Sequence, residues 1–217
     1  MPLKLYFNYF SEPSRAVLIF LKVNNIEHIA QEIKLDGEHK KPEYTSINPF
    51  QKVPCLKDGD FIVRESISAA KYIASKCKTA DHWYPKDLER RTRVDEYLDW
   101  QHMNTRTIGN KAFYTKVLAP WFTSKPVDTQ QLQVDLEAVA VCYRQIENNF
   151  LGDSSFLCGE EISLADIFAA CEIVQTTVCG DTLGQHPKLQ SWIHRVQQKL
   201  SPYFDEIHKP LLNSYKE

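Results

Sequence analysis

The stretch YFNYFSEPSRAVLIFLKVNN, residues 6–25, joins a strand to a helix and decides how the fold begins. Its apolar, aromatic start completes a predicted strand over Leu3–Phe7, and the apolar spacing that follows predicts a helix over Pro13–Asn24. Pro13 suits the first helical turn, where a missing N–H costs nothing. Ser11 stands at the junction, where a hydroxyl can cap the helix or point at a bound anion.

The next segments extend this unit into a small sheet. Residues 28–35, HIAQEIKL, alternate enough to form a second strand, and residues 53–63, VPCLKDGDFIV, read as a hairpin around Asp58-Gly59. Residues 36–50 between them read as a polar loop, and a helical period returns after the hairpin. The order β-α-β, loop, β-β-α predicts a mixed sheet with helices packed on it.

From Pro85 the chain is predicted to be all helical, since no later segment reads as a strand. Apolar residues recur every three to four positions in four long segments, and a short helix is expected in the tail. These segments cover residues 90–118, 131–150, 164–178 and 187–200, with the tail helix starting near Tyr203. We therefore predict an α/β domain over 1–77, a linker over 78–86 and an all-α domain over 87–217.

The composition of the sequence argues against several classes of protein. The 217 residues are 43% hydrophobic and 25% charged, with a net charge of -2, which indicates no nucleic-acid-binding surface. No run approaches the roughly 18 apolar residues of a membrane span. The six cysteines are scattered without a CxxC pair or a histidine-rich cluster, so neither a metal site nor a disulfide scaffold is expected. We expect a reduced, cytoplasmic protein with neither nucleic acid nor membrane as a partner.

Four segments, taken together, resemble the cytosolic glutathione transferases. FSEPSRAV (10–17) is similar to the Ser-x-Pro-x-Arg segment of the theta and delta classes, and INPFQKVPCLKDGDFIVRES (47–66) to the family's Asn-Pro-x-x-x-Val-Pro core. ISLADI (162–167) resembles its Ser-x-x-Asp capping motif, and HWYPKDLERRTRVDEYLDWQH (82–102) is close to theta-class sequences. The resemblance implies a thioredoxin-like first domain, a helical second domain and a homodimer.

The family's activity implies a role for Ser11. These enzymes detoxify hydrophobic electrophilic small molecules by joining them to the thiolate of glutathione, which is a co-substrate, and no cofactor is implied. By resemblance, the Ser11 hydroxyl stabilises the thiolate. Tyr6 and Tyr9 are the rival donors, because other classes use a tyrosine near the end of the first strand. Ser14 and Arg15 are interpreted as structural.

The glutathione site is expected on two backbone features. If Pro54 follows a cis peptide bond, as the family's equivalent does, Val53 presents its backbone N–H and C=O to glutathione as a neighbouring strand would. Glu65 and Ser66 precede a helix, where they can cap it or hold the γ-glutamyl end of the ligand. The resemblance also places three cations near the glycine carboxylate: His39, Lys40 and Lys52. As exposed contacts they contribute about 0.2–1 kcal/mol each.

The second substrate is expected against the helix that carries Gln101 and His102, with Met103 and Arg106 as the pocket residues. Arg106 matches an arginine that theta-class enzymes direct at the cleft; an ordinary surface arginine is the alternative. Phe113, Trp121 and Phe122 could line an apolar pocket, but packing in the core or at an interface is the preferred interpretation. Mammalian theta enzymes continue beyond the position where this sequence stops, so a more open pocket is expected, and theta and delta classes both stay possible.

The remaining motif and two alternative functions complete the interpretation. Ser163 and Asp166 have the form of a capping box, with Ile162 and Ile167 spaced as a hydrophobic staple. A non-catalytic binding module on the same fold is the main alternative to an enzyme. A thiol-disulfide oxidoreductase would need a cysteine where Ser11 stands.

Overall fold

The computed structural model describes residues 2–180 and 182–215. The chain divides into two compact units. One comprises the chain up to Tyr84 together with the part from Leu200 onward, and the other runs from Pro85 to Lys199. Within the described residues no helix is both long and apolar enough to cross a membrane. The domain boundaries 1–77, 78–86 and 87–217 stay a prediction.

The first unit is built on a four-stranded mixed sheet with the strand order β2-β1-β3-β4. The strands are β1 (Leu3–Phe7), β2 (His28–Glu32), β3 (Cys55–Asp58) and β4 (Phe61–Val63). β1 runs parallel to β2 and antiparallel to β3, and β3 and β4 form the predicted hairpin. Asp58 pairs with Phe61, so the hairpin loop has two residues, one of them Gly59 at φ 59°.

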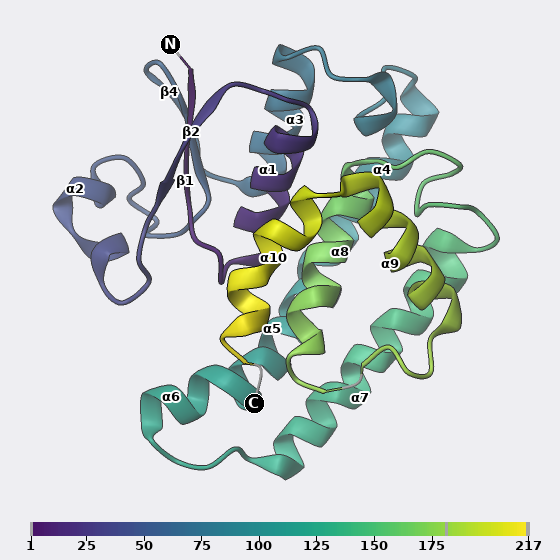
Figure 1. Ribbon diagram of the computed structural model, residues 1–217. Coiled ribbons are helices and arrows are strands. Elements are labelled where there is room, and N and C mark those ends of the chain that lie inside the picture. Colours follow the sequence, from purple (N-terminus) through teal and green to yellow (C-terminus); the bar gives the residue numbers. More distant parts are fainter. Residues whose placement is uncertain (1, 181, 216–217) are drawn as a thin grey trace. The chain divides into compact units, whose positions relative to one another are not determined.

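Helices cover both faces of this sheet (Figure 1). α1 (Glu12–Val23) and α3 (Ser66–Lys76) lie on one side, and α2 (Pro42–Thr45) lies on the other. α10 (Tyr203–Asn213) packs against α1. The predicted order of elements is confirmed, with α1 within one residue of the expected helix.

The prediction of a polar loop over 36–50 was wrong. A 3₁₀ turn at Glu38–Lys40 and the one-turn helix α2 lie inside it. The stretch reads as polar because most of its residues are charged or polar, but one residue, Tyr44, is buried. Tyr44 and Tyr6 belong to a small apolar cluster on the α2 side of the sheet. The rings of Tyr44 and Tyr6 have centroids 5.8 Å apart.

The second unit is helical, as predicted. Its first segment is a continuous helical run of three α-helical stretches joined by π turns: α4 (Leu88–Gln101), α5 (Thr107–Phe113) and α6 (Ala119–Thr123), with the π turns at His102–Arg106 and Tyr114–Leu118. The other helices are α7 (Thr129–Gln145), which continues into a π turn at Ile146–Leu151, α8 (Leu164–Thr177) and α9 (Pro187–Leu200). Almost every residue of α8 is buried, so this helix forms the centre of the unit.

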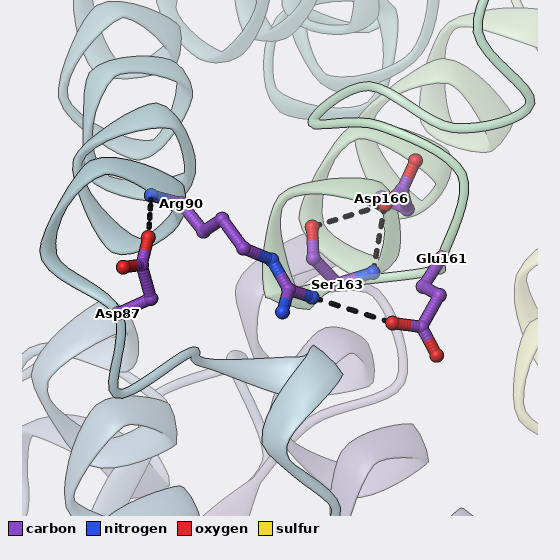
Figure 2. A network of polar contacts seen from close by, with 5 residues as sticks. All are labelled: Asp87, Arg90, Glu161, Ser163 and Asp166. Atoms are coloured by element: carbon purple, nitrogen blue, oxygen red, sulfur yellow. Dashed lines mark hydrogen bonds and ion pairs between the residues drawn. The ribbon is translucent and has the colours of Figure 1, made fainter.

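The predicted capping box begins α8. Asp166 accepts hydrogen bonds from both the backbone N–H and the hydroxyl of Ser163, at 2.8 and 3.0 Å. Figure 2 shows this cap together with the ion pair, 3.3 Å long, between Arg90 at the start of α4 and Glu161 in the loop before α8. The capping motif therefore serves folding, as expected from the sequence.

Candidate functional site

Ser11 lies where the segment that follows β1 enters α1, and it is the residue that caps this helix. Its Oγ accepts a hydrogen bond from the Ser14 N–H at 3.4 Å and donates one to the Val53 carbonyl at 3.4 Å. Ser11 is half-buried. The structure therefore brings together two residues that the sequence analysis assigned to the same site, 42 positions apart.

The backbone at Val53 is held from one side. The Lys52 carbonyl accepts hydrogen bonds from the Tyr44 hydroxyl at 2.6 Å and from the Asn48 side-chain amide at 2.7 Å. This carbonyl and the Val53 N–H belong to one planar trans peptide, so they point in opposite directions. The Val53 N–H consequently points away from Tyr44 and Asn48. The next peptide bond, Val53-Pro54, is cis, as the resemblance implied.

Glu65 and Ser66 lie at the beginning of α3, but Ser66 is not the residue at the N-cap position. Glu65 is the N-cap residue, its side chain makes no capping hydrogen bond, and Ser66 is already the first helical residue. Glu65 is exposed and Ser66 is 3% exposed. The helix thus begins with an exposed carboxylate beside the backbone N–H groups of its first turn, which carry the positive end of the helix dipole.

The three predicted cations occupy two different segments. His39 and Lys40 lie on the 3₁₀ turn Glu38–Lys40, where the His39 ring contacts the Lys34 carbonyl at 3.3 Å. Lys52 is exposed and adjoins Val53 in sequence. Among the contacts of the described residues, none joins His39 or Lys40 to Ser11 or Val53.

The rival tyrosines pack against other aromatic rings. Tyr6 is 4% exposed and packs on Tyr44 in the apolar cluster. The Tyr9 ring packs edge-on against Phe7, with centroids 4.9 Å apart. Burial, together with the charge of Glu32, raises the pKa of Tyr9, which makes its hydroxyl a weaker donor.

The structural assignments of Ser14 and Arg15 agree with their burial. The Ser14 hydroxyl is buried, and no described residue hydrogen-bonds to it. Arg15 is fully buried, and its Nη1 donates to the Tyr9 carbonyl at 2.7 Å. Cys55, which follows Pro54, is also buried, and burial raises the pKa of its thiol to about 11. A thiol so protonated is a poor nucleophile.

The expected second-substrate residues lie in the second unit, on the π turn His102–Arg106. Met103 is 76% exposed, and Arg106 Nη1 lies 3.2 Å from His102 Nδ1. π turns interrupt helices frequently at functional sites. Gln101 is buried and donates to the Leu98 carbonyl, so its side chain belongs to the core of the unit rather than to the wall of a pocket.

The three aromatic residues interpreted as packing divide into two kinds. Phe113 is buried in the core of the second unit. Trp121 and Phe122 are about two-thirds exposed, at 66% and 65%, and contact each other with ring centroids 4.7 Å apart.

Three residues to which the sequence analysis gave no role of their own contribute to the candidate site: Asn8, Tyr44 and Asn48, the last of them the asparagine of the quoted Asn-Pro motif. Asn8 and Asn48 each accept a hydrogen bond from the backbone N–H two residues later, at 2.9 and 3.1 Å. The sequence contains a signal for both, because an asparagine side chain favours turns in which it bonds the backbone two residues later. The burial of these asparagines is a tertiary property that the local pattern does not carry.

Two family models match the chain. The glutathione S-transferase N-terminal domain matches residues 1–75, and the glutathione S-transferase C-terminal domain matches residues 106–199. The glutathione S-transferase theta-1 of Bos taurus is 40% identical over 217 residues, which is 99% of this chain and 90% of the relative. The chain belongs to the glutathione S-transferase family.

Solved structures of glutathione S-transferases agree with this assignment. Human glutathione S-transferase T1-1 in its apo form superposes with a TM-score of 0.95 at 38% identity, covering 99% of this chain and 91% of the other. A human theta-class enzyme in complex with the glutathione conjugate of 1-menaphthyl sulfate gives a TM-score of 0.95 at 36% identity, covering 100% and 89%. A Bombyx mori glutathione transferase, BmGSTD1, reaches only 26% identity with a TM-score of 0.83. The predicted theta-class resemblance and the glutathione S-transferase fold are confirmed.

Proposed function

We propose that this glutathione S-transferase joins the thiol sulfur of glutathione to electrophilic small molecules, and that the Ser11 hydroxyl keeps this sulfur ionised. One observation supports the role of Ser11 above the others. The hydroxyl lies at the start of α1, and both of its hydrogen bonds, to the Ser14 N–H and the Val53 carbonyl, are 3.4 Å long. Bonds of that length are weak, so the hydroxyl hydrogen can turn toward a thiolate at little cost.

The magnitudes fit this role. A free thiol has a pKa of about 8.5, and lowering it by about two units requires roughly 2.7 kcal/mol of preferential stabilisation of the thiolate. A hydroxyl that donates to a charged acceptor contributes about 1.5–3 kcal/mol, and a helix N-terminus adds about 0.3–2 kcal/mol. The serine and the start of α1 are together sufficient, so no general base is required.

In this reaction no protein group forms a covalent bond to either substrate. The thiol proton leaves to water, and a sulfur electron pair forms the new C–S bond. A leaving group departs with its electron pair, or an epoxide C–O bond opens and its oxygen takes up a proton. Ser11 donates a hydrogen bond throughout and is not the nucleophile.

Glutathione is proposed to bind as an extended peptide beside Val53. The Val53 N–H, which points away from the Lys52 carbonyl's partners, is the donor. The exposed Glu65 carboxylate attracts the ligand's amine, while Ser66 and the first turn of α3 hold its γ-glutamyl carboxylate. We assign the glycine carboxylate to three cations: His39, Lys40 and Lys52.

The electrophile is proposed to be hydrophobic and to contact Met103 and Arg106. The exposure of Met103 supplies apolar surface, and the guanidinium supplies a charge for an anionic group. A panel of aryl halides, epoxides, alkyl halides and hydroperoxides measures which electrophiles are accepted. Homodimer formation and a cytoplasmic location complete the proposal. Both are expected from the family, and the six free cysteines accord with a reducing compartment.

Replacement of Ser11 by alanine tests the proposal. Ser11→Ala should lower the rate of conjugation near neutral pH by about tenfold or more, because a loss of about 1.4 kcal/mol of thiolate stabilisation is a factor of ten. The affinity for glutathione should stay close to that of the wild type, since the sulfur is the only part of the ligand that the hydroxyl is proposed to contact. Steady-state kinetics and the pH dependence of thiolate absorbance in the glutathione complex measure both effects.

Two further variants make this test specific. Ser14→Ala removes a buried hydroxyl to which no described residue hydrogen-bonds, so it serves as the matched control and should keep the thiol pKa unchanged. Tyr9→Phe tests the rival donor. Wild-type activity in Ser11→Ala together with a defect in Tyr9→Phe would reassign the donor to Tyr9. Binding of glutathione without turnover of any electrophile would favour the non-catalytic binding module.

A further inference from the structure

The turn that carries Ser11 is organised by one buried side chain, that of Asn8. Asn8 is 4% exposed and is the last residue before the chain turns from β1 toward α1. Its Oδ1 accepts a hydrogen bond from the Phe10 N–H at 2.9 Å, and its own carbonyl accepts one from the Ser11 N–H at 3.1 Å. Two successive peptide units that lead to Ser11 are therefore bonded to the same residue.

The peptide unit between Tyr9 and Phe10 is clamped from both sides. Its carbonyl accepts a hydrogen bond from Arg15 Nη1 at 2.7 Å, while its N–H donates to Asn8 Oδ1. A planar peptide that is held at both ends cannot rotate about its axis without breaking one of these bonds. Because Arg15 is fully buried, this clamp is shielded from competing water.

The other half of the Asn8 carboxamide ties the turn to the sheet. Its Nδ2 donates to the Ile33 carbonyl at 3.0 Å and to Glu32 Oε1 at 3.3 Å, where the chain leaves β2. Both amide hydrogens and the amide oxygen are thus used, which is a match that only an asparagine-like group provides. The orientation of the carboxamide fixes where the turn stands relative to the edge of the sheet.

We propose that Asn8 is a positioning residue for Ser11, and that the orientation of its carboxamide sets the pKa of the bound thiol. This inference rests on the proposed function of Ser11. A hydroxyl stabilises a thiolate only when distance and angle are both favourable, and the interaction weakens steeply as the angle closes. The two hydrogen bonds of the Ser11 hydroxyl to described residues are both 3.4 Å long, so they hold its direction only weakly. The turn that places Ser11 is held by shorter bonds, which the Phe10 and Ser11 N–H groups donate to Asn8 and Arg15 donates to the Tyr9 carbonyl.

Asn48 forms the same type of turn beside the other half of the site. The Phe50 N–H donates to its Oδ1 at 3.1 Å, the Gln51 N–H donates to its carbonyl at 3.0 Å, and its Nδ2 donates to the Lys52 carbonyl. This turn holds the backbone that precedes Val53 and does not contact Ser11. A change at Asn48 should therefore act on the KM for glutathione, whereas a change at Asn8 should act on the thiol pKa and kcat.

The experiment compares Asn8→Ala with Asn8→Ser. Both variants lose the donors to Ile33 and Glu32, but a serine hydroxyl at position 8 can still accept from the N–H two residues later, although more weakly. Asn8→Ala should raise the pKa of the bound thiol by about one unit and lower kcat near neutral pH about tenfold. The KM for glutathione should change less than about threefold, and Asn8→Ser should give an intermediate thiol pKa.

Two controls separate positioning from stability. Asn24→Ala removes a bond of 3.0 Å to the Phe20 carbonyl at the far end of α1, so it should lower stability without moving the thiol pKa. Asn48→Ala should raise the KM for glutathione with the thiol pKa unchanged. If Asn8→Ala does not fold, the pKa in Asn8→Ser decides, because it must lie above that of the wild type.

The outcomes distinguish this inference from the proposed function. A wild-type thiol pKa in a folded Asn8 variant, alongside a raised pKa in Ser11→Ala, overturns the positioning role and leaves the role of Ser11 intact. An unchanged thiol pKa in Ser11→Ala overturns the proposed function itself. Equal losses of stability in both Asn8 variants, with no change of pKa, would make Asn8 purely structural.

Discussion

His208 shows how burial can dominate the charge of a residue. It lies on α10, is fully buried, and its Nδ1 is 2.8 Å from the Phe204 carbonyl. No described residue hydrogen-bonds to its Nε2. Burial, with a smaller contribution from the charge of Arg15, lowers the pKa of His208 to about 3, although the bond to Phe204 acts in the opposite direction. The imidazole is therefore neutral at physiological pH, with its proton on Nδ1.

This residue predicts a loss of stability in mild acid. The unfolded chain takes up a proton on His208 near pH 6.5, whereas the folded chain does so only near pH 3. The stabilisation is complete above about 6.5 and is lost progressively as the pH falls toward 3, by about 1.4 kcal/mol per pH unit. Near pH 5 the free energy of unfolding should thus have fallen by about 2 kcal/mol through this group.

Urea unfolding of the wild type and of His208→Asn near pH 7 and pH 5 measures this difference. Asparagine supplies an N–H for the Phe204 carbonyl and does not titrate, so the variant should lose less stability between the two pH values. An identical pH dependence in both proteins would show that His208 is protonated without cost in the fold.

At the scale of the elements, the first turn of α8 is held by several buried hydrogen bonds to one carboxylate, that of Asp166. Besides the two bonds from Ser163, the buried Asp166 carboxylate accepts hydrogen bonds from the Leu157 N–H and from Trp192 Nε1, both at 2.9 Å. One carboxylate therefore joins the cap of α8, the loop before it and the fully buried Trp192 of α9. The motif Ser-x-x-Asp predicted the cap, but the bond from Trp192 joins residues 26 positions apart and could not be predicted from local sequence.

Asp166→Ala should lower the free energy of unfolding of the second unit by about 3 kcal/mol or more. The substitution leaves several buried donors without an acceptor, at about 1–3 kcal/mol each before relaxation. Glu161→Ala is the matched control, because it removes only the exposed ion pair with Arg90 seen in Figure 2 and should cost at most about 1 kcal/mol. Thermal or urea unfolding of the two variants compares them, and equal losses would contradict the central role of Asp166.

For the whole molecule, periodicity predicted the elements well and their irregularities poorly. The strands, the hairpin and the long helices followed from apolar spacing, with β1 predicted at its observed bounds. The π turns, such as the one at His102–Arg106, did not, because one extra residue in a turn barely alters a pattern of three to four. In the proposed site, Ser11 and Val53 were predicted from motifs, whereas the role proposed for Asn8 depends on a burial that appears only when β1 and β2 pair.

The last helix predicts how the first unit depends on the end of the chain. α10 packs against α1, and Phe204, Ile207 and Leu211 are at most 6% exposed. Burial of each such side chain contributes about 1.5–3 kcal/mol, so that α10 supplies about 5–9 kcal/mol. This is comparable with the whole stability of a typical domain, about 5–15 kcal/mol. A chain that ends at Ser201 should therefore not fold its first unit and should lose retention on immobilised glutathione.

A chain that ends at Ser214 is the control for this truncation, because it keeps all of α10 and should still be retained. The pair of chains separates the effect of the helix from the effect of shortening as such. α10 is more than a hundred residues from Ser11 in sequence, but it packs against α1, the helix that Ser11 caps. Loss of α10 should therefore weaken glutathione binding, which precedes any chemical step. Normal retention of the chain that ends at Ser201 would show that α1 and the sheet hold the site without this cover.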